Sequence, residues 1–226
     1  MNRLNWLFTA TSLAVVLVTI ERFSPTVSVL LPPHDFLRLH EVVQMSVLIL
    51  LTVIIPALQL WELSGGAPKL WAFVAFVIGA YFYATGNGVH EQASFAYYTY
   101  CPVGPHNLCD GLFFNTYYAG NIGFFVGALI MTVTLLLVER SRPREAFGGG
   151  ALAILVVNAV IYSLTVLAYA GFDLVLVGLV YSLVAALVSI GLFVSVRRRW
   201  REHPFITYST IVYVLGTVAS AVVRLV

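Results

Sequence analysis

The sequence predicts an all-α protein that crosses a membrane with seven helices. Hydrophobic residues make up 60% of the 226 residues and charged residues only 10%, whereas a soluble domain carries about 25% charged residues. The mean hydropathy is +0.93 for the whole chain, which leaves no room for a sizeable soluble domain. We therefore expect residues 1–226 to form a single transmembrane helical domain and not a soluble enzyme.

Seven apolar segments are separated by polar, proline-containing or glycine-containing breaks. Crossing a bilayer takes roughly 20 apolar residues, with a range of about 17–25. Lipid offers no hydrogen-bond partners to the backbone, so each segment is predicted to be a helix. The predicted segments are Leu4–Ile20, Leu37–Leu60, Leu70–His90, Leu112–Val138, Gly150–Ala170, Leu174–Val196 and Phe205–Val222.

The first two segments need separate justification. Leu4–Ile20 follows Arg3 as a secretion signal would, but residues 19–23 offer no small-residue cleavage site, so we expect a retained helix. The second segment contains Pro56, which predicts a kink. The turn at residues 171–173 joins the fifth and sixth segments so closely that these two must be antiparallel neighbours.

Positive charge predicts the orientation of the chain. Cytoplasmic loops carry an excess of lysine and arginine. With a cytoplasmic N-terminus, nine of the twelve basic residues lie inside, and only Arg22, Arg38 and Arg224 lie outside. The sequence therefore predicts a plasma or inner membrane protein with its N-terminus inside and its C-terminus outside. The nine inner residues are Arg3, Lys69, Arg140, Arg142, Arg144, Arg197, Arg198, Arg199 and Arg201.

This orientation places most acidic and imidazole side chains on the outer side. Only one histidine, His203, falls inside. The outer surface carries no basic stripe interleaved with aromatic residues, so nucleic acid is excluded as a partner. The outer residues are His34, His40, His90, His106, Glu21, Asp35, Glu41, Glu91, Asp110 and Asp173.

The only two cysteines, Cys101 and Cys109, lie in one predicted outer loop. An oxidising compartment and a loop rich in proline and glycine favour a disulfide. It would hold the loop between the third and fourth segments over the outer side of the bundle. The alternatives are two free thiols or a metal pair completed by His106.

Two His-Glu dipeptides, His40-Glu41 and His90-Glu91, occur where the second segment starts and the third ends. These segments are antiparallel, so both dipeptides are predicted at similar depth, close to Asp110 before the fourth segment. Ionisable residues at membrane depth tend to face a cavity or a partner. We predict His40, His90 and Asp110 as metal ligands, because two histidines and a carboxylate suit Zn²⁺ or non-haem Fe²⁺.

The predicted catalytic residues are Glu41, Glu91, Asp110 and Asn121. Carboxylates could move protons or help a metal to activate water. Asn121 lies eleven residues beyond Asp110, about 16 Å along a helix, which suggests a polar stripe along a cavity. The structural alternatives are a wet helix start for Glu41, a helix cap for Asp110 and an interhelical hydrogen bond for Asn121.

In its seven-helix plan and outer His/acid residues, the sequence resembles the membrane hydrolases related to alkaline ceramidases and adiponectin receptors. That family uses a His-x-x-x-His pair in its last helix. Phe205–Val222 contains no histidine, so none of the family's residues can be matched to this chain. Rhodopsins need a lysine in the last helix, and the only lysine here is Lys69, in a loop.

Three functions are consistent with these patterns. The first is a membrane enzyme, a hydrolase or an oxidase, that acts on a lipid or isoprenoid substrate near the outer leaflet. The second is an electron-transfer subunit that binds a quinone, or a b-type haem with His40 and His90 as axial ligands. The third is a transporter or an accessory subunit, alone, as a homo-oligomer or in a larger membrane complex, whose polar residues only join helices.

Overall fold

The computed structural model describes residues 3–102 and 106–225, and it confirms the predicted helix bundle. Across this part of the chain, seven helical segments are long and apolar enough to cross a membrane, and none of the residues forms a strand. The protein is therefore a multi-pass integral membrane protein. Many large apolar side chains remain exposed on the bundle, as expected for a surface that faces lipid.

Several of the seven spans are made of consecutive helical elements. The first contains α1 (Arg3–Glu21) and η1 (Pro25–Ser28), and the third is α4 (Leu70–Tyr100) alone. The remaining spans consist of α2 (Leu39–Val42), η2 (Val43–Leu48) and α3 (Ile49–Leu63); α5 (His106–Phe114), η3 (Asn115–Gly120) and α6 (Asn121–Arg140); α7 (Gly149–Gly171); α8 (Val177–Val196) with η4 (Arg197–Glu202); and α9 (Pro204–Leu225).

Two of these spans extend beyond their predicted ends. The predicted third segment ends at His90, whereas α4 continues to Tyr100. The predicted fourth segment starts at Leu112, whereas α5 starts at His106. Both extensions are polar or aromatic rather than aliphatic, so hydropathy alone does not detect them. They place His90 and Glu91 inside a continuous helix and not at a frayed end.

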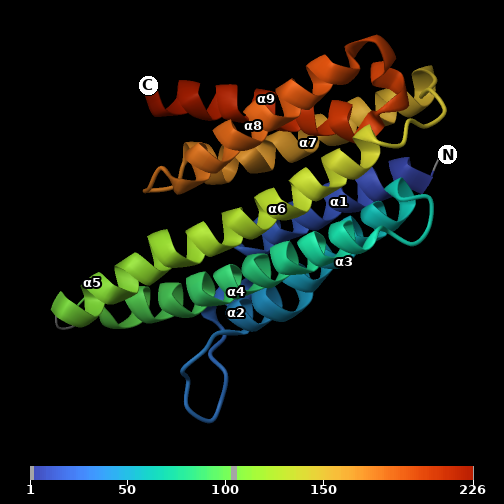
Figure 1. Ribbon diagram of the computed structural model, residues 1–226. Coiled ribbons are helices and arrows are strands. Elements are labelled where there is room, and N and C mark those ends of the chain that lie inside the picture. Colours follow the sequence, from blue (N-terminus) through green and yellow to red (C-terminus); the bar gives the residue numbers. More distant parts are fainter. Residues whose placement is uncertain (1–2, 103–105, 226) are drawn as a thin grey trace.

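The helices form two layers that meet through α1 and through α6, which packs against α8 and α9 (Figure 1). One layer contains α3, α4 and α6, and the other contains α7, α8 and α9. Helix α1 packs against both α3 and α7. The two chain ends lie at opposite ends of the bundle (Figure 1).

Glycines allow α4 and α6 to touch through their backbones. A Cβ atom added to Gly86 would lie 2.0 Å from the backbone nitrogen of Phe124. One added to Gly127 would lie 2.2 Å from the backbone nitrogen of Tyr83. Small residues at such crossings are a general means of packing membrane helices. This contact fixes the position of every side chain on the facing sides of α4 and α6.

Two loops complete the fold at the end of the bundle that carries Asp110. Residues 29–39 form a hairpin that projects from the bundle, closed by a bridge between Leu30 and Arg38 (Figure 1). Cys101 and Cys109 form the predicted disulfide, which joins the end of α4 to α5. The side chain of His106, the alternative metal partner of these cysteines, lies outside the described residues.

Candidate functional site

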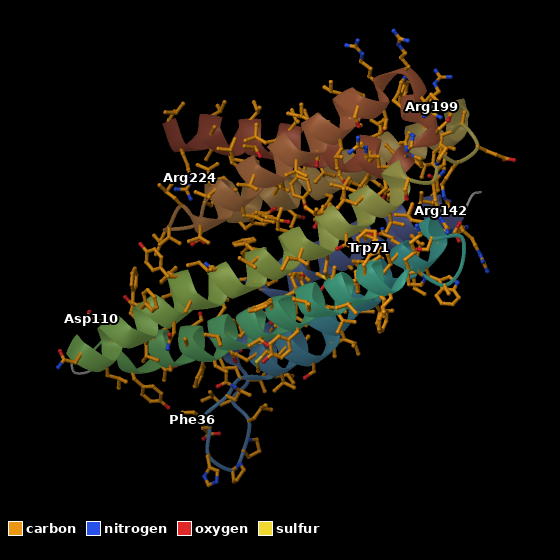
Figure 2. All side chains as sticks on the ribbon, in the orientation of Figure 1. Phe36, Trp71, Asp110, Arg142, Arg199 and Arg224 are labelled. Atoms are coloured by element: carbon orange, nitrogen blue, oxygen red, sulfur yellow. A yellow bond between two sulfur atoms is a disulfide. The ribbon has the colours of Figure 1, made fainter. Side chains whose placement is uncertain are left out.

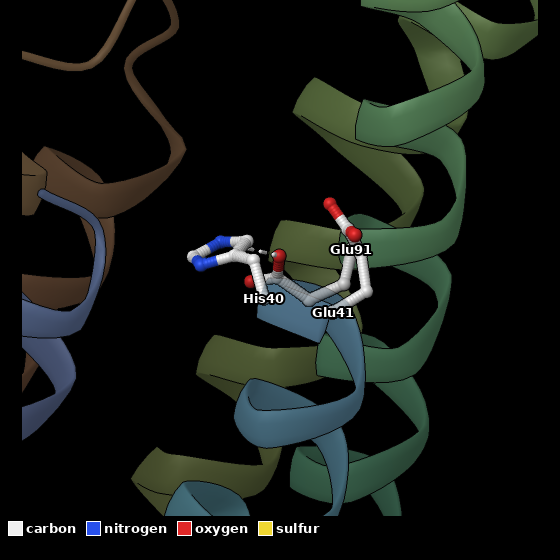
Figure 3. Close-up of side chains that lie close together, drawn as sticks. All are labelled: His40, Glu41 and Glu91. Atoms are coloured by element: carbon white, nitrogen blue, oxygen red, sulfur yellow. Dashed lines mark ion pairs between the residues drawn. The ribbon is translucent and has the colours of Figure 1, made fainter. Parts of the chain in front are cut away.

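The first group of functional interest is a buried cluster at the start of α2. His40 and Glu41 come from α2 and Glu91 from α4, and all three side chains are buried (Figure 3). One nitrogen or oxygen atom from each lies within 4.8 Å of the others. The two His-Glu dipeptides therefore do meet, as the antiparallel arrangement of the second and third spans predicts.

Within this cluster, Glu41 is fully engaged by Arg38. One carboxylate oxygen accepts the backbone N–H of Arg38 at 2.9 Å, as in a capping box at a helix start. The other accepts Nε of Arg38 at 2.9 Å and Nη2 of the same guanidinium. The Arg38 guanidinium also lies over the ring of Phe95, 5.3 Å from its centre. Glu41 thus starts α2 and has no oxygen without a partner.

His40 lies between carboxylates from two other helices. Its Nδ1 is 2.6 Å from Oε2 of Glu21, at the end of α1. Its Nε2 is 3.6 Å from Oε2 of Glu91. Glu21 is held in turn by Nε2 of Gln44, which donates to its Oε2 at 2.9 Å, and by the hydroxyl of Thr26. The imidazole therefore joins α1, α2 and α4.

Glu91 is the least satisfied member of the cluster. It is 2% exposed, and its Oε1 has no hydrogen-bond partner among the described residues. The nearest cation is Nη2 of Arg22, 3.6 Å from this oxygen. The three carboxylates of Glu21, Glu41 and Glu91 face the two guanidiniums of Arg22 and Arg38. Three negative and two positive charges leave a net charge of −1, which protonation of His40 would cancel.

These contacts limit how the cluster could hold a metal ion. Glu91 Oε1 has no hydrogen-bond partner among the described residues, and the two nitrogens of His40 lie close to the carboxylates of Glu21 and Glu91. Glu41 could join them only if Arg38 were displaced. Catalytic zinc usually has three protein ligands. The donor types suit zinc or iron, but the two arginines already neutralise most of the negative charge that would attract a cation.

The second group lies in a cavity of about 600 Å³ between the two helix layers. On α4 its wall follows one helical face, with Tyr83 deepest and then Asn87, His90, Ser94 and Tyr98 in successive turns. Helices α1, α3, α6, α7 and α8, the π-helical turn η3 and the turn between α7 and α8 form the other walls. A smaller cavity of about 80 Å³ lies deeper and shares several wall residues with it.

The two ends of this cavity differ in character. Nine of its wall residues are aromatic and occur at both ends, whereas the deep end around Tyr83 is lined mainly by rings and aliphatic groups, with the hydroxyl of Thr52 bonded to Tyr83. The other end carries the polar side chains, including one arginine, one aspartate and one histidine. The aromatic residues are Tyr83, Tyr98, Tyr117, Phe124, Phe125, Tyr162, Tyr169, Phe172 and Tyr181, and the polar end contains Arg22, Asn87, His90, Thr116, Asn121 and Asp173.

His90 is fixed at this polar end by the backbone of η3. Its Nδ1 lies 2.8 Å from the carbonyl oxygen of Thr116. A carbonyl oxygen can only accept, so Nδ1 carries the proton and Nε2 of the neutral ring carries the lone pair. Gly120 permits this contact, since a Cβ added there would lie 2.7 Å from the backbone nitrogen of His90. Because η3 is a π-helical turn, the site includes a feature often found at functional positions.

Asp173 and Asn121 face each other across the same end. Nδ2 of Asn121 donates to Oδ2 of Asp173 at 3.2 Å and to the carbonyl oxygen of Tyr117 at 3.1 Å. Burial raises the pKa of the Asp173 carboxyl above its ordinary value, and backbone N–H groups and nearby positive charge offset this only in part. Arg224 donates to the backbone carbonyl of Asp173 at 2.7 Å, which holds the turn between α7 and α8.

The sequence-predicted residues are thus divided between two groups. His40, Glu41 and Glu91 form the cluster, whereas His90 and Asn121 line the cavity. Asp110 belongs to neither, because it is exposed on α5, at the end of the bundle and away from both (Figure 2). The predicted ligand set of His40, His90 and Asp110 is therefore not brought together in the described part of the chain.

Several residues of both groups were not singled out from the sequence. Glu21 and Arg22 follow a long apolar segment, where charges usually mark only its end. Asn87 lies three residues before His90, on the same helical face, and this spacing could have identified it. Thr116 and Asp173 carry no local signal, since their roles depend on a π-helical turn and on the packing of α7 against α1.

Comparison of the chain with protein families, with curated proteins and with solved structures finds no match. The geometry of the buried cluster and of the cavity is therefore the evidence on which a function can be proposed.

Proposed function

We propose that the protein is an integral membrane enzyme that acts on a lipid- or isoprenoid-type molecule held in the large cavity. The observation that carries this proposal is the two-ended character of that cavity. Its deep end around Tyr83 consists mainly of aromatic rings and aliphatic groups, and its other end presents the ionisable and amide groups of His90, Asn121 and Asp173. An amphiphile would place its chain at the first end and its reactive polar group at the second.

The dimensions and surroundings of the cavity support a lipid-like ligand. A volume of about 600 Å³ falls within the roughly 300–1,000 Å³ of typical ligand sites. The walls are membrane-spanning helices, so the ligand that reaches them most readily is one dissolved in the bilayer. The single arginine on the wall, Arg22, is already paired with Glu91, so little positive charge is available for a strongly anionic ligand.

The polar end carries groups suited to proton transfer. The contact with Thr116 leaves the lone pair of His90 on Nε2, where it can act as a base. Asp173 has a raised pKa because it is partly buried, which favours its protonated, acidic form. Asn121 orients the Asp173 carboxyl. A base and an acid on opposite walls of one cavity are what hydrolysis or isomerisation of a bound lipid requires.

The buried cluster has a supporting role in this proposal. Glu91 follows His90 directly, and it pairs with Arg22, which also lines the cavity. The cluster therefore holds one wall of the cavity in place. A zinc or iron ion bound by His40 and Glu91 would lie behind Arg22 and not among the cavity residues, and metal analysis of the purified protein tests this point separately.

Orientation links the site to the outer leaflet. Arg142 and Arg199 lie at the opposite end of the bundle from Asp110 (Figure 2). Under the positive-inside rule this arginine-rich end is cytoplasmic, which puts the polar end of the cavity on the outer side. The proposed substrate would then enter from the outer leaflet.

A quinone-binding electron-transfer role is the second candidate, favoured by the nine aromatic wall residues. Flat rings stack well on aromatic side chains, and a quinone would fit the same cavity. In the haem version of this hypothesis, His90 could ligate through its free Nε2, but His40 lies between Glu21 and Glu91 in the buried cluster and does not line the cavity.

The test is labelling with a photoreactive lipid in native membranes. A geranylgeranyl alcohol carrying a diazirine should label peptides from α4, α6 and α7. Ala168→Phe, which puts a ring into the cavity, should reduce labelling at least fivefold. Ala84→Phe is the matched control, because Ala84 is exposed on α4 and does not line the cavity. Equal labelling of both variants would contradict the proposal and favour an accessory or transport role.

A further inference from the structure

We infer that the arginine-rich end of α8 and η4 binds the head group of an anionic phospholipid in the leaflet at that end of the bundle. Directly after the last residue of α8, η4 carries the η4 arginine cluster, which consists of Arg197, Arg198, Arg199 and Arg201. Figure 2 shows Arg199 at the end of the bundle opposite Asp110. The cluster is separate from the cavity, so this inference does not rest on the proposed function.

The charges of the η4 arginine cluster are accessible and mostly unpaired. All four residues are exposed. Arg199 lies 3.7 Å from the carboxylate of Glu202, whereas the other three arginines form no ion pair with any described residue. The guanidinium of Arg201 lies 5.2 Å from the centre of the Trp200 ring. Like charges that gather in this way create a positive potential, which favours a bound anion.

The other acidic residues at this end do not neutralise the cluster. Glu62 pairs with Arg144 at 2.9 Å. Glu139 is fully buried and accepts two backbone N–H groups at the start of α9, at 2.8 and 2.7 Å. Glu145 is exposed and forms no ion pair with a described residue. The positive charge of the cluster is therefore available to a molecule outside the protein.

The backbone of η4 is held in place by the elements next to it. The backbone N–H of Phe147, in the loop before α7, donates to the carbonyl oxygen of Arg201 at 3.0 Å. The hydroxyl of Thr207, on α9, donates to the carbonyl oxygen of Trp200 at 3.0 Å. A ligand therefore meets arginines on a fixed backbone, which lowers the entropy lost on binding.

An apolar, exposed face of α8 leads directly to the cluster. Leu187, Ile190 and Val194 are spaced by three and four residues, so they lie on one side of the helix. The least exposed of them, Ile190, is 40% exposed. The backbone N–H of Arg197 bonds to the carbonyl oxygen of Val194, and side chains three residues apart in such a 3-10 turn lie above one another. The apolar face therefore ends at the guanidinium of Arg197.

A phospholipid fits this arrangement better than a soluble anion does. Its acyl chain can lie along the apolar face while its phosphate contacts Arg197 and Arg198, and arginine binds phosphate through paired hydrogen bonds. Basic clusters next to a membrane helix attract anionic lipids. The positive-inside rule explains which side of the membrane carries arginines, but it does not require them to continue a lipid-facing side of a helix.

The experiment counts lipids bound to the purified full-length protein in detergent by native mass spectrometry. Phosphatidylglycerol and phosphatidylcholine with identical acyl chains are titrated separately, so the two probes differ in the net charge of the head group. The wild type should bind phosphatidylglycerol about tenfold more tightly or better, since a hydrogen bond between charged groups contributes at least this much.

A pair of double variants connects the preference to the η4 arginine cluster. Arg197→Gln combined with Arg198→Gln should bring phosphatidylglycerol binding down to the level of phosphatidylcholine. Phosphatidylcholine binding should stay unchanged, which also shows that the variant is folded. Arg140→Gln combined with Arg142→Gln is the matched control, because it removes the same charge from two exposed arginines that have no ion pair with a described residue. This control should keep the preference.

Three results would overturn the inference. Equal affinity of the wild type for the two lipids would show that the head-group charge is not recognised. An equal loss in both double variants would show that total charge, and not the η4 arginine cluster, attracts the lipid. Displacement of phosphatidylglycerol by inorganic phosphate would show that the arginines bind a soluble anion. None of these results would affect the proposed function, which is tested by labelling in the cavity.

Discussion

His90 and Glu91 are neighbours in the chain, but their side chains enter two different environments. Glu91 faces the buried cluster with His40, whereas His90 lines the cavity. Adjacent residues on a helix point about 100° apart, so one dipeptide can serve two groups. Arg22 connects them, because it lines the cavity and pairs with Glu91.

The pair of Arg38 and Glu41 allows a direct test of the cluster. Arg38→Gln leaves the fully buried Glu41 carboxylate without its guanidinium. Removing one partner of a buried pair costs about 3 kcal/mol or more, so thermal unfolding in detergent should shift clearly to lower temperature.

The control for this variant is Arg199→Gln, which removes an exposed ion pair with Glu202. Exposed pairs contribute about 0–1 kcal/mol, so its unfolding curve should stay close to that of the wild type. Adding Glu41→Gln to Arg38→Gln should recover part of the lost stability, because no buried charge then remains. Equal effects of Arg38→Gln and Arg199→Gln would show that the cluster does not depend on this pair.

The raised pKa of Asp173 predicts that the difference in stability between the wild type and Asp173→Asn depends on pH. Its folded-state pKa is raised by burial, so above the ordinary value the folded state holds a proton that the unfolded state has released. The free energy of unfolding then falls as pH rises through this window. Asp173→Asn cannot titrate. The stability of the variant relative to the wild type should therefore increase as pH rises from about 4, until the raised pKa is passed.

Unfolding temperatures in detergent across this pH range provide the measurement. Asp110→Asn makes the same chemical change at an exposed position of α5 and serves as the control. A difference between Asp173→Asn and the wild type that stays constant with pH would contradict the role of burial at Asp173.

At the level of single residues, sequence patterns identified part of the site. The two His-Glu dipeptides predicted that the start of the second span and the end of the third lie at similar depth, and the structure places His40, Glu41 and Glu91 together there, without His90. The position of Asp110 could not be predicted, because the disulfide loop and α5 carry it past the cluster. The roles of Arg38 and Asp173 could not be predicted from the sequence either. They depend on how separate elements pack, and no local sequence pattern indicates that packing.

Two π-helical turns are the elements that shape the site. η2 (Val43–Leu48) follows His40 and Glu41 and carries Gln44, while η3 (Asn115–Gly120) carries Thr116. Each widened turn occurs inside a span that hydropathy predicts as one regular helix. Length and apolar composition were enough to predict the seven spans, because the bilayer dictates both. The π-helical turns could not be predicted, because they have no comparable signature in the sequence.

The crossing of α4 and α6 predicts an effect of a single methyl group. Gly86→Ala would place a Cβ 2.0 Å from the backbone nitrogen of Phe124, so the two helices must separate. Overpacking typically costs roughly 1–3 kcal/mol. We expect the free energy of unfolding to fall by about 3 kcal/mol or more, together with loss of photolabelling in the cavity.

Gly88→Ala on the same helix is the matched control. A Cβ added at Gly88 meets no atom within 4 Å, and alanine is favoured over glycine in helices by roughly 0.5–1 kcal/mol. Thermal unfolding in detergent should therefore show Gly88→Ala at or above the wild type. If Gly86→Ala is equally stable, the helices are not in backbone contact at this point.

For the molecule as a whole, the distribution of arginine predicts the orientation. A C-terminal alkaline phosphatase fusion should be active in a bacterial host, because the C-terminus is predicted outside. A fusion truncated after Arg142 should be inactive, because that loop is predicted inside. The reversed pattern would place the polar end of the cavity at the cytoplasmic leaflet and would require the substrate to come from that side.

The length of α4 determines how reactants could reach the site. Its 31 residues measure about 46 Å at 1.5 Å per residue, well beyond the roughly 30 Å of hydrocarbon. His90 stands twenty residues after Leu70, about 30 Å along the axis, so with Leu70 at the inner boundary of the hydrocarbon His90 would lie where acyl chains give way to hydrated head groups. A lipid could thus arrive sideways by diffusion within the bilayer while water arrives from above, and the two would meet at the imidazole without the lipid ever leaving its leaflet.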